Sequence, residues 1–147
     1  MKLVDANVLL YAVHQEAEQH VPALAWLDRT MSSADTVLLP WVSLIAFVRL
    51  STHPAVYERP QSVADAFANV QAWLEPAIVI TDQPDVHHPR IMAELLEAAG
   101  GHGGNLVTDA HLAALAVQYD ATVVSYDDDF GRFPGVRWVR PQPPQVN

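Results

Sequence analysis

Aspartates in this chain stand where apolar segments end, and such positions favour chemistry on a bound metal ion. Asp5 follows the apolar pair Leu3 and Val4 and precedes segment 6–13, whose apolar residues recur at helical spacing. We therefore expect Asp5 at the C-terminal end of a short strand, where open α/β sheets bind their ligands. The alternative is a plain helix cap at Asp5, with Asn7 as a competing cap.

Asp109 lies in the first turn of a helix predicted over 106–119. The three- and four-residue spacing of a helix places it on one stripe with Leu112, Ala113 and Ala116, so its carboxylate should face inward. An inward carboxylate needs donors, a counter-charge or a metal, because an unpaired buried charge is costly. Stabilisation of the helix dipole would explain the first-turn position but not the inward face.

Three consecutive aspartates follow a strand predicted over 121–125. Asp127 should share the sheet edge with Asp5, Asp129 is an accessory candidate, and Asp128 is interpreted as a solvated turn residue. Acids from three segments that converge would form an oxygen-only site, which suits Mg²⁺ or Mn²⁺. Such a site supports phosphodiester hydrolysis by a metal-activated water. No Ser–His–Asp or Cys–His arrangement in the sequence competes with this chemistry.

Strands that alternate with helices must position these acids. The pattern predicts strands at 3–4, 36–39, 77–80, 121–125 and 136–139, and helices at 6–13, 20–31, 41–50, 62–74, 85–99 and 106–119. This alternation predicts an α/β fold with a parallel sheet covered on both faces. We expect one domain over 1–140, then a proline-rich irregular tail over 141–147.

Composition excludes several classes of function. The 147 residues carry a net charge of −9, which argues against indiscriminate, salt-driven binding of nucleic acid but leaves a local site open. The chain has no cysteine, which excludes disulfides and thiolate metal sites and fits a reducing cytoplasm. No apolar run approaches the roughly 18 residues that span a membrane.

Arginine and histidine side chains offer further candidates. Arg49 is the only charge on the predicted helix 41–50, and it either binds substrate phosphate or pairs with an aspartate for structural reasons. Arg132 stands with Arg137 and Arg140 near the last acids, either as a basic rim that binds a phosphate backbone or for solubility. His87 and His88 are interpreted as solvated. His111 is interpreted as a surface residue or as a neighbour of the site. 

Several motifs together resemble those of a known family, the PIN-domain ribonucleases, and more narrowly the VapC toxins of bacterial type II toxin–antitoxin pairs. The resemblance covers nearly the whole chain. It rests on the segments LVDANVLL at 3–10, LPWVSLIAFVRL at 39–50, LVTDAHLA at 106–113, SYDDDF at 125–130 and FPG at 133–135.

This resemblance implies a three-layer α/β/α sandwich with a central, mostly parallel sheet. It also implies a cytoplasmic, Mg²⁺-dependent endoribonuclease, with Mn²⁺ as a substitute, that is inhibited by a cognate VapB-like antitoxin and forms a homodimer. Asp5, Asp109 and Asp127 fall on the acidic positions of the family, with Asp129 as an accessory ligand.

One position departs from the family pattern. Many PIN nucleases carry a glutamate in the helix after the second strand, and we assign this position to Phe47 in a helix that has no acid. The alternative function is therefore a catalytically impaired PIN-like module that binds RNA or protein. A phosphoacceptor signalling domain is disfavoured, because it needs a lysine late in the chain and the only lysine is Lys2.

Overall fold

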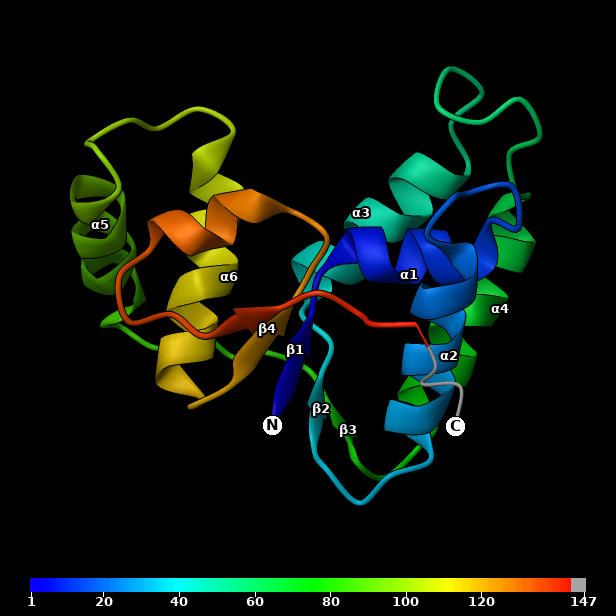
Figure 1. Cartoon of the computed structure of the whole chain (residues 1–147), viewed down its shortest axis with the longest axis horizontal. Helices are drawn as coiled ribbons and strands as arrows, with labels where there is room; N and C mark the ends of the chain where they lie inside the picture. The colour runs from blue at the N-terminus through cyan, green and yellow to red at the C-terminus, as the bar shows by residue number, and fades with distance from the viewer. Residues whose placement is uncertain (144–147) are drawn as a thin grey trace.

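A parallel five-stranded sheet forms the centre of the molecule (Figure 1). We describe residues 1–143 of the chain in a computed structural model. The strand order is β3-β2-β1-β4-β5, and all four pairings are parallel. The strands are β1 (Lys2–Val4), β2 (Val37–Leu38), β3 (Val79–Ile80), β4 (Thr122–Val124) and β5 (Trp138–Val139). The predicted edge strand near the C-terminus is thus confirmed as β5.

Helices cover both faces of this sheet. They are α1 (Ala6–Val13), α2 (His20–Met31), α3 (Trp41–Ser51), α4 (Val63–Leu74), α5 (His88–Ala98) and α6 (Leu106–Gln118), and a 3₁₀ helix, η1, spans Asp128–Arg132. In Figure 1, α5 and α6 lie on one side of the strands, and α1, α2 and α4 lie on the other. The predicted α/β fold with helices on both faces of a parallel sheet is confirmed.

Alternation along the strands divides the core into two clusters. Leu3 packs with the α5 and α6 side, whereas the next residue, Val4, packs with the α1 and α4 side. Val123 and Val124 repeat this alternation on β4. Successive side chains of a strand point to opposite faces, so each short strand supplies both layers of the core.

Capping residues set where several elements begin. Ser62 caps α4 by accepting a hydrogen bond of 3.0 Å from the backbone N–H of Asp65, as its position in the sequence predicted. α5 begins at His88 rather than near residue 85, with a proline in its first turn. Residues 141–143 lie outside helices and strands, and residues 144–147 of the predicted tail lie outside the described part of the chain.

Phe47 belongs to the core. It does not lie at the acidic edge, by which we mean the end of the sheet where Asp5 follows β1 and Asp127 follows β4. Its side chain is fully buried and meets the ring of Trp73 edge-on at a centroid distance of 4.7 Å. Val42, by contrast, packs against the cluster on the α6 side, and Ala46 lies one turn further along the same stripe of α3. At the position assigned to the missing glutamate, the chain thus has a buried aromatic residue that offers no ligand.

Candidate metal centre

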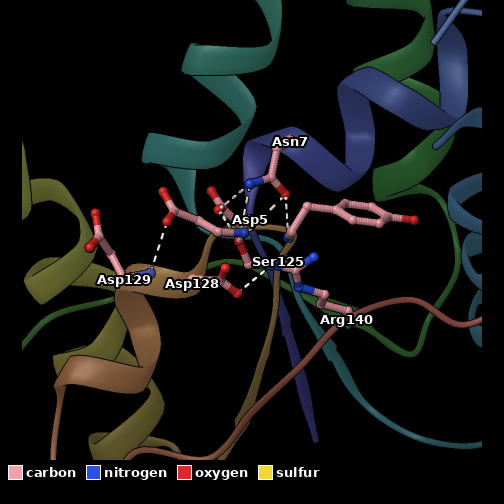
Figure 2. A network of polar contacts seen from close by, with 8 residues as sticks. Asp5, Asn7, Ser125, Asp128, Asp129 and Arg140 are labelled. Atoms are coloured by element: carbon pink, nitrogen blue, oxygen red, sulfur yellow. Dashed lines mark hydrogen bonds and ion pairs between the residues drawn. The ribbon is translucent and has the colours of Figure 1, made fainter. Parts of the chain in front are cut away.

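Asp5 lies at the C-terminal end of β1, where it caps α1 (Figure 2). Its Oδ1 accepts a hydrogen bond of 2.7 Å from the backbone N–H of Ala6. Its Oδ2 accepts from the Ser125 hydroxyl at 2.6 Å and from the Asn7 side-chain amide at 3.0 Å. Asp5 can therefore cap the helix and also belong to a group of acids, because its two oxygens accept hydrogen bonds from different donors.

Asn7 and Ser125 hold the ends of β1 and β4 together. The Asn7 amide also donates to the Ser125 oxygen at 3.0 Å, and its carbonyl oxygen accepts from the backbone N–H of Tyr126 at 3.1 Å. The Ser125 oxygen further accepts from the backbone N–H of Asp127 at 2.9 Å. Sequence analysis missed Ser125 and treated Asn7 only as a cap. The available signal was that each is a small polar residue two positions from a candidate acid.

Three carboxylates from two further segments approach one another closely. Single oxygens of Asp109, Asp127 and Asp129 all lie within 4.8 Å of one another. Asp109 comes from the first turn of α6, and Asp127 caps η1 by accepting a hydrogen bond of 2.9 Å from the backbone N–H of Asp129. The tightest group therefore contains Asp129, which the sequence indicated only as an accessory ligand. Asp5 is not part of this group, but it is close enough for its charge to act on Asp109.

Electrostatics distinguish these carboxyl groups. Burial, followed by the charges of Asp127, Asp5 and Asp129, raises the pKa of Asp109 to about 7. Burial also raises the pKa of Asp5, although the hydrogen bonds from Ser125 and Ala6 oppose this shift. The cluster thus carries more negative charge than the surrounding protein compensates, and a cation would relieve this repulsion.

The donor set fits a hard divalent cation. All candidate ligands are carboxylate oxygens, which Mg²⁺ and Mn²⁺ prefer over nitrogen and sulfur. Within residues 1–143, the only cation paired with one of these four acids is Arg132, whose Nη1 lies 3.4 Å from Asp129 Oδ1. A single exposed arginine at that distance leaves the remaining acids available for a metal ion.

The arginines near the C-terminus are paired one by one. Arg132 also donates to the carbonyl oxygen of Ala99 at 3.2 Å. Arg137 pairs with Asp120 at 2.6 Å, and Arg140 pairs with Asp128. The predicted basic rim is therefore largely neutralised by neighbouring carboxylates. Asp128 is exposed, in agreement with its interpretation as a solvated residue.

Arg49 lies away from these contacts. It is exposed and lines an apolar groove on α3 and α4 with Trp41 and Phe67. Among the described residues, no hydrogen bond or ion pair joins it to an aspartate, so the predicted structural pairing is not formed. 

Two histidines meet between α5 and α6. His88 is buried, and its Nε2 lies 2.7 Å from Nδ1 of His111. Its Nδ1 lies 2.5 Å from the side-chain oxygen of Gln118, and the Nε2 of Gln118 donates to Asp85 at 2.8 Å. The prediction that His88 is solvated is wrong. Burial and the neighbouring His88 lower the pKa of His111, which therefore joins α5 to α6 as a neutral ring.

A parallel α/β sheet with carboxylates gathered at the C-terminal ends of its strands defines a class of metal-dependent hydrolases. The family model of the PIN domain matches residues 2–136, and the chain belongs to this family. Within it, the chain is a homologue of the VapC ribonucleases. No helix of the described residues has both the length and the apolar character to cross a membrane.

Relatives and solved structures agree with this placement. Ribonuclease VapC37 of Mycobacterium tuberculosis is 52% identical over 141 residues, which cover 96% of this chain and 97% of that protein. Ribonuclease VapC25 of the same organism is 36% identical over 96% of this chain and 99% of the relative. The crystal structure of M. tuberculosis VapC20, described as a sarcin–ricin loop cleaving toxin, matches with a TM-score of 0.67 at 17% identity over 93% of this chain and 99% of that one.

A second structural match is a toxin–antitoxin complex. The VapBC2 structure from Rickettsia felis, bound to a DNA fragment from the promoter, matches with a TM-score of 0.65 at 18% identity. The match covers 95% of this chain and 97% of that chain. At such identities the VapC20 and VapBC2 structures support the fold alone. Membership of the family is supported by the sequence identity to VapC37 and VapC25.

Proposed function

We propose that this chain is the toxin of a type II toxin–antitoxin pair and cleaves RNA endonucleolytically with Mg²⁺ bound by Asp5, Asp109, Asp127 and Asp129. Mn²⁺ would be an effective substitute. The observation that carries the proposal is the approach of three carboxylates within 4.8 Å beside a fourth, on a chain 52% identical to a ribonuclease. We treat residues 1–140 as one nuclease domain.

Asp109, Asp127 and Asp129 supply the closest set of oxygen ligands. Asp5 adds negative charge at the same edge of the sheet, because it raises the pKa of Asp109. Ser125 and Asn7 fix the orientation of the Asp5 carboxylate through their hydrogen bonds to its Oδ2. A divalent ion held by these carboxylates would supply a nucleophilic water at neutral pH and would neutralise charge on the scissile phosphate.

The residues around the acids do not include a free histidine base. Nδ1 of His111 is already engaged with His88, and the pKa of His111 is lowered. Arg132 is the arginine nearest to the acids, since it contacts Asp129, and we propose that it turns to the substrate phosphate when RNA binds. Arg49 would reach phosphate only from the side of α3, and its exposed position leaves this role as a weaker proposal.

The partner would be a VapB-like antitoxin. Two of the matching solved structures are titled as VapBC complexes, and a third is titled FitAcB, from Neisseria gonorrhoeae. These names describe the matched proteins, and from them we carry over to this chain only the expectation of an antitoxin partner. We also propose a homodimer and a cytoplasmic location, which would place the enzyme with its RNA substrate.

A matched pair of substitutions tests the nuclease proposal. Asp109→Asn should abolish cleavage of labelled RNA in Mg²⁺, while Asp35→Asn, in an exposed loop, should leave cleavage unchanged. Both variants should fold, as circular dichroism would show. Full RNase activity of Asp109→Asn would contradict the assignment of the metal centre.

One observation favours a second function. α3 presents no carboxylate to the acidic edge, because the helix contains no aspartate or glutamate and Phe47 lies in the core. A chain with this deficit could serve as a PIN-like module that binds RNA or protein without cleaving it. Calorimetric titration separates the two functions: no binding of Mg²⁺ or Mn²⁺ at millimolar concentration would favour the binding module.

A further inference from the structure

A cavity of about 480 Å³ lies at the C-terminal end of α1, away from the four aspartates. Tyr11 and His14 line it from α1 and its cap, and Tyr57 lines it from the loop between α3 and α4. Its volume falls in the range of cavities that hold small ligands or single groups of larger ones.

Aromatic rings connect this cavity to the acidic edge. Tyr126 stands between Ser125 and Asp127, and its ring meets the ring of Tyr11 edge-on at a centroid distance of 5.3 Å. Tyr11 in turn lines the cavity. Because α1 rises by about 1.5 Å per residue, its two ends lie only about 12 Å apart. The cavity and Asp5 thus lie at opposite ends of α1, and the contact between Tyr11 and Tyr126 joins the cavity wall to the segment of Asp127.

His14 and Tyr57 form a ready stacking platform. Their rings are stacked at a centroid distance of 3.5 Å with an angle of 6° between their planes. Burial lowers the pKa of His14, so its ring is neutral at pH 7. Flat neutral and phenolic rings of this kind are the surfaces on which proteins stack unpaired nucleobases.

Two polar atoms along this path lack partners. Among the described residues, the His14 Nε2 and the Tyr126 hydroxyl are buried without a hydrogen bond. Buried polar atoms are normally satisfied. Of these two, only the His14 nitrogen belongs to a residue that lines the cavity, so it is the atom that a ligand with a polar edge would complete.

The charges around the cavity select a base over a phosphate. Glu16 and Glu58 line it together with a single arginine, Arg59. This excess of carboxylates disfavours a phosphate group. Carboxylates accept hydrogen bonds from the amino groups of bases, as they do from cytosine in DNA complexes.

We propose that this cavity binds one unpaired base of the RNA substrate, stacked on the platform of His14 and Tyr57, a short distance along the strand from the scissile phosphate. The proposal rests on the proposed nuclease function for the identity of the substrate. It assigns specificity to α1 and the loop at 52–62, elements that contribute no carboxylate to the metal centre.

Removal of single bases from an RNA probe tests the proposal. The probe is a labelled single-stranded RNA with one abasic ribose placed in turn at each position, and its affinity is measured by fluorescence anisotropy in Ca²⁺. One abasic position should weaken binding by the wild type about tenfold or more, as expected for loss of a base stacked on an aromatic ring.

Two variants of Tyr57 complete the experiment. Tyr57→Leu should bind the intact RNA about tenfold more weakly and no longer distinguish the abasic probe, whereas Tyr57→Phe keeps the ring and should behave like the wild type. In cleavage assays with Mg²⁺, Tyr57→Leu should raise KM and leave kcat unchanged. Thermal unfolding compares the stability of the two variants.

The outcomes separate the two proposals. If the wild type cleaves RNA and Tyr57→Leu has the same KM and the same abasic profile, the base site is wrong and the nuclease proposal stands. Such a result would leave the cavity for a protein partner. If the wild type shows the abasic effect but never cleaves, the nuclease proposal fails and the base site stands.

Discussion

The Ser125 hydroxyl donates a hydrogen bond of 2.6 Å to Asp5, although 120 positions separate the two residues in the chain. Ser125 follows β4, Asp5 follows β1, and the two strands pair in parallel register from Lys2 to Val4. The bond therefore joins the ends of two neighbouring strands and fixes the carboxylate at the acidic edge. Removing the hydroxyl tests both consequences.

Ser125→Ala should lower the free energy of unfolding by about 1–3 kcal/mol, because it leaves buried acceptors and the Asn7 amide with fewer partners. It should also weaken Mg²⁺ binding, since Asp5 loses its shortest donor. Chemical denaturation and calorimetric titration measure the two effects. Ser33→Ala, at an exposed turn, is the matched control, and an equal effect in both variants would contradict the role of Ser125.

Asp109→Asn should stabilise the protein in the absence of metal. The pKa of Asp109 is raised from 3.8 to about 7, so the folded chain holds this proton more tightly than the unfolded chain does. The stability of the metal-free wild type should therefore fall as pH rises from about 4 to about 7, and the loss is complete above pH 7. In the variant this slope should be smaller, with the remainder due to Asp5. Tm values of the wild type and the variant in EDTA at pH 5, 6, 7 and 8 measure this slope. If the Tm of both proteins changed equally with pH, the raised pKa of Asp109 would be refuted.

Mg²⁺ should raise Tm more at pH 8 than at pH 6. Protons and the metal ion compete for Asp109, whose pKa lies near 7, so the apparent affinity for metal increases as pH rises through that value. A ligand that binds only the folded state stabilises it in proportion to the logarithm of its concentration over Kd. Thermal scans with and without Mg²⁺ at the two pH values provide the measurement, with Asp109→Asn as the control that should lose the pH dependence.

Ala46→Glu and Phe47→Glu should differ sharply. Ala46 is half-buried and lies one helical turn after Val42, which packs on the α6 side, so we expect a glutamate there to fold and to bind Mg²⁺ more tightly than the wild type does. Phe47 is fully buried against Trp73, so a glutamate there buries an unpaired charge in the core and should unfold the protein. Circular dichroism followed by metal titration distinguishes the variants. A folded Phe47→Glu with improved metal affinity would contradict this expectation and support Phe47 as the metal-facing position.

The position of Asp5 was predictable because its signals are local. An apolar pair followed directly by helical periodicity places the residue between them at the end of a strand, and parallel strands end at one edge of the sheet. The same reasoning placed Asp127 after β4. The roles of these residues in metal binding remain predictions, which the substitutions above address.

Other parts of the site depend on contacts between distant segments. The pairing of Ser125 with Asp5 requires the register of β1 against β4, which no local pattern encodes. His88 lies next to another histidine and looked solvated, yet the packing of α5 on α6 buries it against His111. Val42 and Phe47 lie on the same helix, and only the rotation of α3 against the sheet decides that Val42 packs on the α6 side and Phe47 on the other.

The short strands make the acidic edge a reporter of correct folding. β1 is three residues long, and a slip of one residue against β4 would exchange the faces of Leu3 and Val4 and separate Asp5 from Ser125. A mispaired chain would therefore lose its core and its metal ligands in the same step. Partly folded molecules of this toxin should consequently be harmless, and nuclease activity should appear only with the final native packing.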